Sequence, residues 1–127
     1  MWYNSLIKDK EESIMPFINV KTNAAVPADK AEAIKAGLGQ AITAVPGKTE
    51  AWLMVAVEGD KALWFKGTDE PAAMVEVSLM GAASSAALTD MTGRITDLLT
   101  DTLGLPADRI YVSYFSTDHW GWNGSNF

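Results

Sequence analysis

The chain contains no cysteine, which excludes disulfides, thiolate catalysis and zinc–thiolate sites. It contains a single histidine, His119, and no serine lies in the context of a nucleophile elbow, so a serine–histidine–carboxylate triad is not indicated. Apolar runs are short, and none approaches the roughly 20 residues that a membrane helix needs. We therefore expect no thiol redox chemistry and no membrane partner.

Basic residues are also scarce. Ten Lys and Arg residues stand against sixteen Asp and Glu residues, which gives a formal net charge of −6. An acidic surface of this kind argues against nucleic acid or an anionic membrane as a partner. With 127 residues, 48% of them hydrophobic, the chain suits one domain with its own core.

Residues 1–15 do not resemble a secretory leader. The charges from Lys8 to Glu12 interrupt the continuous apolar stretch of about 7–15 residues that a leader needs. One interpretation is a short disordered or helical extension. A second is a start site placed too far upstream, because codons for Lys10-Glu11-Glu12 can form a purine-rich run like a bacterial ribosome-binding sequence just before Met15.

We therefore predict a bacterial protein with two parts. Residues 1–15 are an extension absent from the mature protein, and residues 16–127 are the folded domain. Proline is small enough for routine removal of a preceding initiator Met, so Pro16 would become the first residue. We expect a cytoplasmic location, or export without a conventional signal peptide.

Hydrophobic periodicity predicts a strand, a helix and a strand in the first half of the domain. Alternation over Phe17–Lys21 predicts the first strand. Apolar residues from Ile34 to Val45 share one helical face, and Pro46-Gly47 ends that helix. The apolar run Trp52–Val57 predicts a buried strand, and Ala62–Phe65 predicts a short strand that pairs with it as a hairpin.

The second half repeats this scheme. It predicts a strand over Met74–Met80, a helix whose apolar face runs from Leu88 to Leu103, and a strand over Ile110–Phe115. Each β-α-β unit makes two parallel strands with a right-handed crossover. The predicted fold class is α/β (α+β): duplicated β-α-β units that form a four-stranded mixed sheet with two helices on one face.

The strands carry apolar residues on both of their sides, although only one side has helices to cover it. These residues are Met54, Ala56, Val75, Val77 and Leu79. The alternative cover is the C-terminal tail, which is too short to cover four strands. We therefore expect the uncovered face to be buried by oligomerisation.

Two features of the domain suggest chemistry. If the chain begins at Pro16, the ring nitrogen is a secondary amine that can act as a base; with residues 1–15 attached it is an amide. The tail from His119 to Phe127 places two tryptophans in a glycine-rich ending, which suits either subunit packing or an aromatic-substrate pocket. Lys48 follows the helix-ending Pro46-Gly47 and gains interest beside such a base.

Five short motifs resemble the macrophage migration inhibitory factor (MIF) branch of the tautomerase superfamily, in order and spacing over residues 16–127. They are Pro16-Phe17-Ile18, Pro46-Gly47-Lys48, Ser78-Leu79-Met80-Gly81, Asp108-Arg109-Ile110-Tyr111 and the ending Gly121-Trp122-Asn123-Gly124-Ser125-Asn126-Phe127. The resemblance implies a homotrimer with an active site at each subunit interface and an N-terminal proline as the catalytic base.

By position, the resemblance gives roles to eight residues. Pro16 is the base, Lys48 binds the substrate carboxylate, Met80 borders the pocket, and Tyr111 reaches in from the neighbouring subunit. Trp52, Trp122 and Phe127 form aromatic walls. Ser113 stands where the best-known members have an asparagine that contacts the far polar end of an aromatic substrate, so this chain departs from the pattern there.

The implied reaction is keto–enol tautomerisation of an aromatic 2-oxo acid such as phenylpyruvate, or of dopachrome, with no metal or cofactor. The first alternative is a secreted, cytokine-like or host-mimicking protein that binds a host receptor. The second is a relative that decarboxylates or dehalogenates small acids. That chemistry generally uses extra arginines near the base, whereas this chain has only Arg94 and Arg109.

Overall fold

The structure, a computed structural model, describes residues 15–127. Of the predicted extension, only Met15 lies within these residues, and the prediction made for residues 1–14 falls outside them. The main sheet contains strands β1 (Pro16–Thr22), β2 (Met54–Glu58), β3 (Ala73–Met80) and β4 (Ile110–Thr117). The two long helices are α2 (Ala28–Ala41) and α3 (Ser85–Leu103), and a small hairpin is formed by β5 (Gly121–Trp122) and β6 (Ser125–Asn126).

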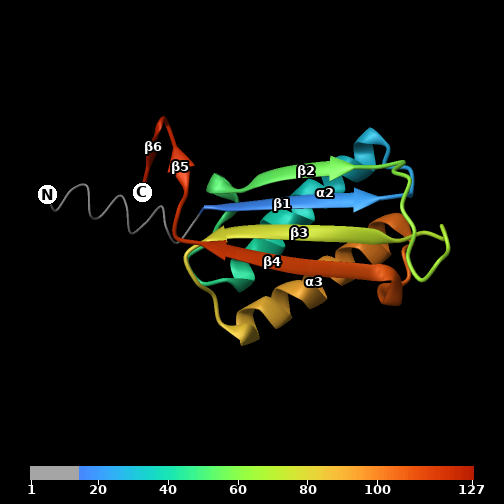
Figure 1. Ribbon diagram of the computed structural model, residues 1–127. Helices are drawn as coiled ribbons and strands as arrows, with labels where there is room; N and C mark the ends of the chain where they lie inside the picture. The colour runs from blue at the N-terminus through green and yellow to red at the C-terminus, as the bar shows by residue number, and fades with distance from the viewer. Residues whose placement is uncertain (1–14) are drawn as a thin grey trace, which may run out of the picture.

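The strand order in the main sheet is β2-β1-β3-β4. Strands β1 and β2 are parallel, as are β3 and β4, while β1 and β3 meet antiparallel at the centre. Figure 1 shows both helices behind the strands. The duplicated β-α-β units, the mixed four-stranded sheet and the two helices on one face are thus confirmed.

The ends of helix α3 follow from local sequence. The Ser84 side chain accepts a hydrogen bond from the Ala87 amide, which caps the first turn. Gly104 ends the helix with φ of 71°, in the left-handed region, and its amide donates to the Thr100 carbonyl. A residue without a Cβ is favoured at this position because the left-handed conformation strains other side chains.

The core lies between the helices and the covered face of the sheet. Every second strand residue points into it, and each fully buried aliphatic side chain stabilises the fold by about 1.5–3 kcal/mol. The strand and helix residues that build this core include Ile18, Val20, Ile34, Leu38, Val75, Val77, Leu79, Met91, Ile95 and Leu99.

No helix of residues 15–127 covers the opposite face of the sheet. Met54 and Phe115 are 67% and 63% exposed. They lie in one row across the sheet, because Met54 pairs with Phe17, Phe17 with Ser78, and Ser78 with Phe115. Polar residues share this face: Lys21 and Glu76 form an ion pair of 3.1 Å. Apolar groups therefore lie on both sides of the strands, as the sequence predicted.

The predicted hairpin at Ala62–Phe65 is wrong. Residues 59–72 form a loop, in which Phe65 and Thr68 make a single isolated bridge around a tight turn. The physical reason is that the loop hydrogen-bonds to the end of β1 and the residues that follow it, and not to β2. The Lys61 amide donates to the Thr22 carbonyl, and the Asp60 amide donates to the Ala24 carbonyl.

Two element boundaries also differ from the prediction. Helix α2 ends at Ala41 and continues as a 3-10 turn, η1 (Ile42–Ala44), before Pro46. Trp52 lies in a second 3-10 turn, η2 (Glu50–Trp52), so that β2 begins only at Met54. Trp52 therefore stands beyond the end of the sheet rather than within it.

Candidate active site

Pro16 begins strand β1 and lies opposite Leu79 of β3. The Met15 carbonyl accepts a hydrogen bond of 3.1 Å from the Met80 amide, so the pairing with β3 continues one residue before the strand. Met15 and Met80 are both buried, at 3% and 2% exposure. In the 127-residue chain the Pro16 nitrogen is an amide, because Met15 precedes it.

Lys48 reaches the same place from a different part of the chain. Its amide donates to the Val45 carbonyl across Pro46-Gly47, and Gly47 has φ of 83°. A proline followed by a residue with positive φ fits a type II turn, which explains the Pro-Gly pair. The turn directs the Lys48 side chain inward, where Nζ donates to the Met80 carbonyl at 3.2 Å.

The Lys48 side chain is almost fully buried, at 4% residue exposure. Burial lowers the pKa of its ammonium group below the usual value, because removal from water disfavours the charged form. Met80 thus accepts from Lys48 through its carbonyl and donates to Met15 through its amide. Met80 therefore contacts both Lys48, the candidate cation, and Met15, which directly precedes Pro16, the candidate base.

The three predicted aromatic wall residues lie together. Trp52 and Trp122 meet edge to face with ring centroids 5.1 Å apart, and Phe127 stacks on Trp122 at 6.3 Å. Hairpin β5–β6 brings the tail into this position through a turn at Asn123-Gly124, where both residues have positive φ. Figure 1 shows this hairpin at the end of the sheet where β1 begins.

Tyr111 and Ser113 lie away from Pro16 in their own chain. Met74 pairs with Tyr111 on one side and with Lys21 on the other, whereas Pro16 pairs with Leu79. The five-residue step from Pro16 to Lys21 spans about 17 Å at the usual strand rise. The structure therefore brings together Pro16, Lys48 and Met80, and places the aromatic trio at the same end, but not Tyr111 or Ser113.

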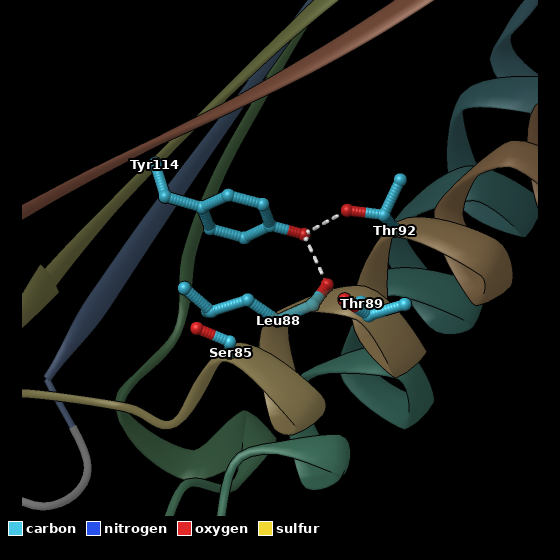
Figure 2. A pocket seen from close by; sticks show the side chains of 5 residues that line it. All are labelled: Ser85, Leu88, Thr89, Thr92 and Tyr114. Atoms are coloured by element: carbon cyan, nitrogen blue, oxygen red, sulfur yellow. Dashed lines mark hydrogen bonds between the residues drawn. The ribbon is translucent and has the colours of Figure 1, made fainter.

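A separate cavity of about 340 Å³ opens between helix α3 and strand β4, lined by Ser85, Leu88, Thr89, Thr92 and Tyr114. Figure 2 shows the Tyr114 hydroxyl in hydrogen bonds of 2.7 Å with Thr92 Oγ1 and 3.1 Å with the Leu88 carbonyl. Burial raises the pKa of Tyr114, which keeps it protonated at neutral pH. These paired, neutral hydroxyls suit a structural role.

Two residues gained no role from the sequence but contact a predicted site residue or its support. Phe65 packs on Tyr111 with ring centroids 4.7 Å apart, although the sequence placed it in a strand. Arg109 is buried at 8% exposure and binds the loop that carries Phe65. The position of Arg109 beside Tyr111 in one motif was the available signal, but its partners lie about forty residues earlier in the chain.

Two features are absent from residues 15–127: a cluster of metal-binding side chains and a membrane-spanning helix. No group of three or more His, Asp or Glu side chains there is arranged to hold a metal ion. Nor does that part of the chain contain a helix of the length and apolarity that crossing a membrane requires.

The duplicated β-α-β fold, with a proline at the head of β1 beside a buried lysine, defines a chain of the tautomerase superfamily. The family model described as macrophage migration inhibitory factor (MIF) matches residues 15–127, and the chain belongs to that family. The mouse macrophage migration inhibitory factor is 31% identical over 118 residues, which cover 89% of this chain and 99% of the mouse protein.

Solved structures agree with this assignment. The structure of Leishmania major MIF2 matches with a TM-score of 0.84 at 36% identity, over 91% of this chain and 99% of that one. The structure of a macrophage migration inhibitory factor homologue from Prochlorococcus marinus matches with a TM-score of 0.73 at 29% identity, over 87% of this chain and 98% of that one. Relatives of this chain thus occur in animals, protists and bacteria.

Proposed function

We propose that the chain, once it begins at Pro16, is a cofactor-independent keto–enol tautomerase for aromatic 2-oxo acids such as phenylpyruvate. The observation that carries this proposal is the convergence on Met80 of the head of β1 and the buried Lys48. A secondary amine and an ammonium group then lie at one end of the sheet, beside three aromatic side chains. These are the groups that binding an aromatic acid and moving one of its protons require.

The reaction needs one base and one anion-binding group. The neutral Pro16 nitrogen removes a proton from the carbon next to the keto group, and the electron pair moves onto the keto oxygen. The protonated amine then returns the proton to that oxygen, which yields the enol. An α-amino group has a pKa of about 7.7–8.0, and apolar walls together with the Lys48 charge lower it further, toward the ideal for proton transfer at neutral pH.

Lys48 would hold the substrate carboxylate and stabilise the negative charge that develops on the oxygen. The Met80 amide supports this role. In the 127-residue chain it donates to the Met15 carbonyl at 3.1 Å, and removal of Met15 frees this donor on the residue whose carbonyl accepts from Lys48 Nζ. Cleavage before Pro16 would therefore create the base and expose a hydrogen-bond donor for the substrate in one step.

A homotrimer completes the proposed site. Tyr111 lies about 17 Å along the strands from Pro16 of its own chain, so it can meet a substrate at Pro16 only when a second copy supplies it. The uncovered sheet face supports association, because it exposes large apolar side chains such as Met54 and Phe115. Ser113 belongs to the same strand as Tyr111 and would reach the site with it.

Three proteins test the proposal: the full 1–127 chain, the chain that begins at Pro16, and the second chain with Pro16→Gly. Phenylpyruvate enolisation is followed by the absorbance of the enol. We expect turnover only from the chain that begins at Pro16, with a large loss in the glycine variant, whose primary amine lacks the ring. Equal turnover by the 1–127 chain would refute a base at the Pro16 nitrogen.

A binding function is the second candidate, and it rests on the relatives. The mouse protein carries the name of a factor that inhibits macrophage migration. A cytokine-like or host-mimicking role on the same assembly would use the surface and not the Pro16 amine. Trp64, exposed at 65% in the 59–72 loop, offers an apolar contact for such a receptor. An inactive chain beginning at Pro16 would favour this candidate.

A further inference from the structure

Arg109 is an unusual arginine, because it is buried and its guanidinium group donates hydrogen bonds to backbone carbonyls. It ends the 3-10 turn η3 (Ala107–Arg109), directly before β4, with 8% of its surface exposed. Its guanidinium donates four hydrogen bonds of 2.9–3.2 Å to the 59–72 loop, at the carbonyls of Phe65, Thr68, Glu70 and Pro71. The planar fork of donors matches this arrangement, which a lysine cannot reproduce.

The same guanidinium supports an aromatic pair. Its central carbon lies 5.3 Å from the centre of the Phe65 ring, within cation–π range. The Phe65 ring in turn meets the Tyr111 ring edge to face, with centroids 4.7 Å apart and an interplanar angle of 66°. Arg109, Phe65 and Tyr111 thus form a continuous row of contacts that ends on a predicted substrate-binding residue.

The loop is fixed from its other side as well. The Asn23 amide group donates to the carbonyls of Leu63, Asp69 and Glu70, at 3.0–3.2 Å. Between these clamps the turn holds Lys66 at φ of 52°, a conformation that non-glycine residues adopt at a cost and keep only where their surroundings enforce it. Phe65, which precedes this turn, therefore has a defined position against Tyr111.

We propose that Arg109 is a positioning residue for the aromatic end of the substrate site. By holding the loop it keeps Phe65 against Tyr111, and Phe65 fixes the orientation in which Tyr111 meets the substrate. This inference rests on the proposed function, because Tyr111 contacts a substrate only in the proposed assembly. Arg109 itself touches neither the substrate nor the reacting atoms.

The kinetic signature follows from where Tyr111 would act. It would contact the far end of the substrate equally in the ground state and in the transition state, so a disturbed ring raises KM and leaves kcat unchanged. Pro16 and Lys48 lie at the other end of their own chain's sheet, so the pH dependence of kcat/KM stays the same. A general loss of folded protein would instead lower the apparent kcat.

The experiment compares variants of the chain that begins at Pro16. Arg109→Lys removes the fork, and Phe65→Leu removes the ring while keeping the carbonyl that Arg109 binds. Each should raise the KM for phenylpyruvate about two- to tenfold, the range expected for loss of one aromatic pair. Arg94→Lys is the matched control, since Arg94 is the only other arginine and makes an exposed ion pair with Asp90.

A double-mutant cycle tests the row of contacts directly. Phe65→Leu should add little to the effect of Tyr111→Leu, because both changes break the same pair. Independent, additive effects, or an unchanged KM in Phe65→Leu, would overturn the inference while leaving the proposed function intact. If Arg109→Lys fails to fold, Phe65→Leu still decides the question.

A readout without substrate separates this inference from the proposed function. The ring proton resonances of Tyr111, identified by their loss in Tyr111→Leu, should shift in Phe65→Leu and Arg109→Lys but not in Arg94→Lys. Unshifted resonances in Arg109→Lys would refute the inference that Arg109 holds Phe65 against Tyr111. If the resonances shift in the two variants but the reference protein is inactive, Arg109 still holds Phe65 against Tyr111. The proposed function, and with it any kinetic role for Arg109, would then be refuted.

Discussion

Lys48 gives the sharpest prediction about the proposed reaction, because its charge is buried and, in that proposal, binds the substrate carboxylate. In the chain that begins at Pro16, Lys48→Met removes the cation that would hold the substrate carboxylate. A hydrogen bond to a charged group contributes about 1.5–3 kcal/mol, which corresponds to about 10- to 150-fold in affinity. We therefore expect the KM for phenylpyruvate to rise by about one to two orders of magnitude, while Lys48→Arg keeps most of the affinity.

The burial of Lys48 predicts the direction in which kcat/KM changes with pH. Burial lowers the pKa of Lys48, so the ammonium group loses its proton earlier than an exposed lysine as the pH rises. The value of kcat/KM should then fall on the alkaline side as the pH passes through this lowered pKa, and fall on the acid side as Pro16 becomes protonated. In Lys48→Arg the alkaline limb should move to higher pH, because a guanidinium stays charged.

Lys48→Met should also move the acid limb. Without the neighbouring positive charge the pKa of the Pro16 amine rises, so the rate begins to fall at a higher pH than in the reference protein. Steady-state kinetics on phenylpyruvate across the pH range measure both limbs. An unchanged KM in Lys48→Met, or an alkaline limb that stays in place in Lys48→Arg, would refute the role given to Lys48.

Three further substitutions test contacts that stabilise the fold. For each one, the free energy of unfolding in urea is compared with that of the parent chain. Gly104→Ala should cost about 1 kcal/mol, because φ of 71° strains a residue with a Cβ although nothing lies within 4 Å. Gly59→Ala should cost about 1–3 kcal/mol, because its Cβ would lie 2.9 Å from Val26 Cγ2 and 3.1 Å from the Ala24 carbonyl oxygen, a backbone atom that cannot move aside. Tyr114→Phe should cost about 1 kcal/mol through its hydrogen bonds to Thr92 and Leu88, and an unchanged midpoint in any of the three would contradict the contact concerned.

The parts of the fold that local chemistry specifies could be predicted from the sequence. The alternation of apolar and polar residues identified β1 and β3, and the helical spacing of apolar residues from Leu88 to Leu103 identified α3. The break in the chain at Pro46-Gly47 was also predicted, because proline and glycine have the conformational preferences of a turn, whereas the inward direction of Lys48 was not. These features depend on neighbouring residues alone.

The 59–72 loop could not be predicted in this way. Its apolar residues from Ala62 to Phe65 have the composition of a strand, but its carbonyls bind Asn23 and Arg109, which are about forty residues distant in each direction. Long-range side-chain hydrogen bonds override local preference there. The same limit applies to the site: the contact of Phe65 with Tyr111 has no local signature.

The separation of Pro16 from Tyr111 bears on the central claim, which is that two copies of the chain build each site. One preparation that begins at Pro16 carries Pro16→Gly and lacks the base, and a second carries Tyr111→Ala and binds phenylpyruvate weakly. Both should therefore turn over slowly at substrate concentrations well below KM, where the assay is made. When equal amounts are unfolded together and refolded, about a quarter of the sites should combine an intact Pro16 from one chain with an intact Tyr111 from another.

This mixing experiment is the most direct test of the account, with phenylpyruvate enolisation as its readout. Recovery of about a quarter of the reference activity is predicted by random assortment of the two chains in a closed ring. Activity that stays at the sum of the two separate variants would contradict a site shared between Pro16 of one subunit and Tyr111 of the next.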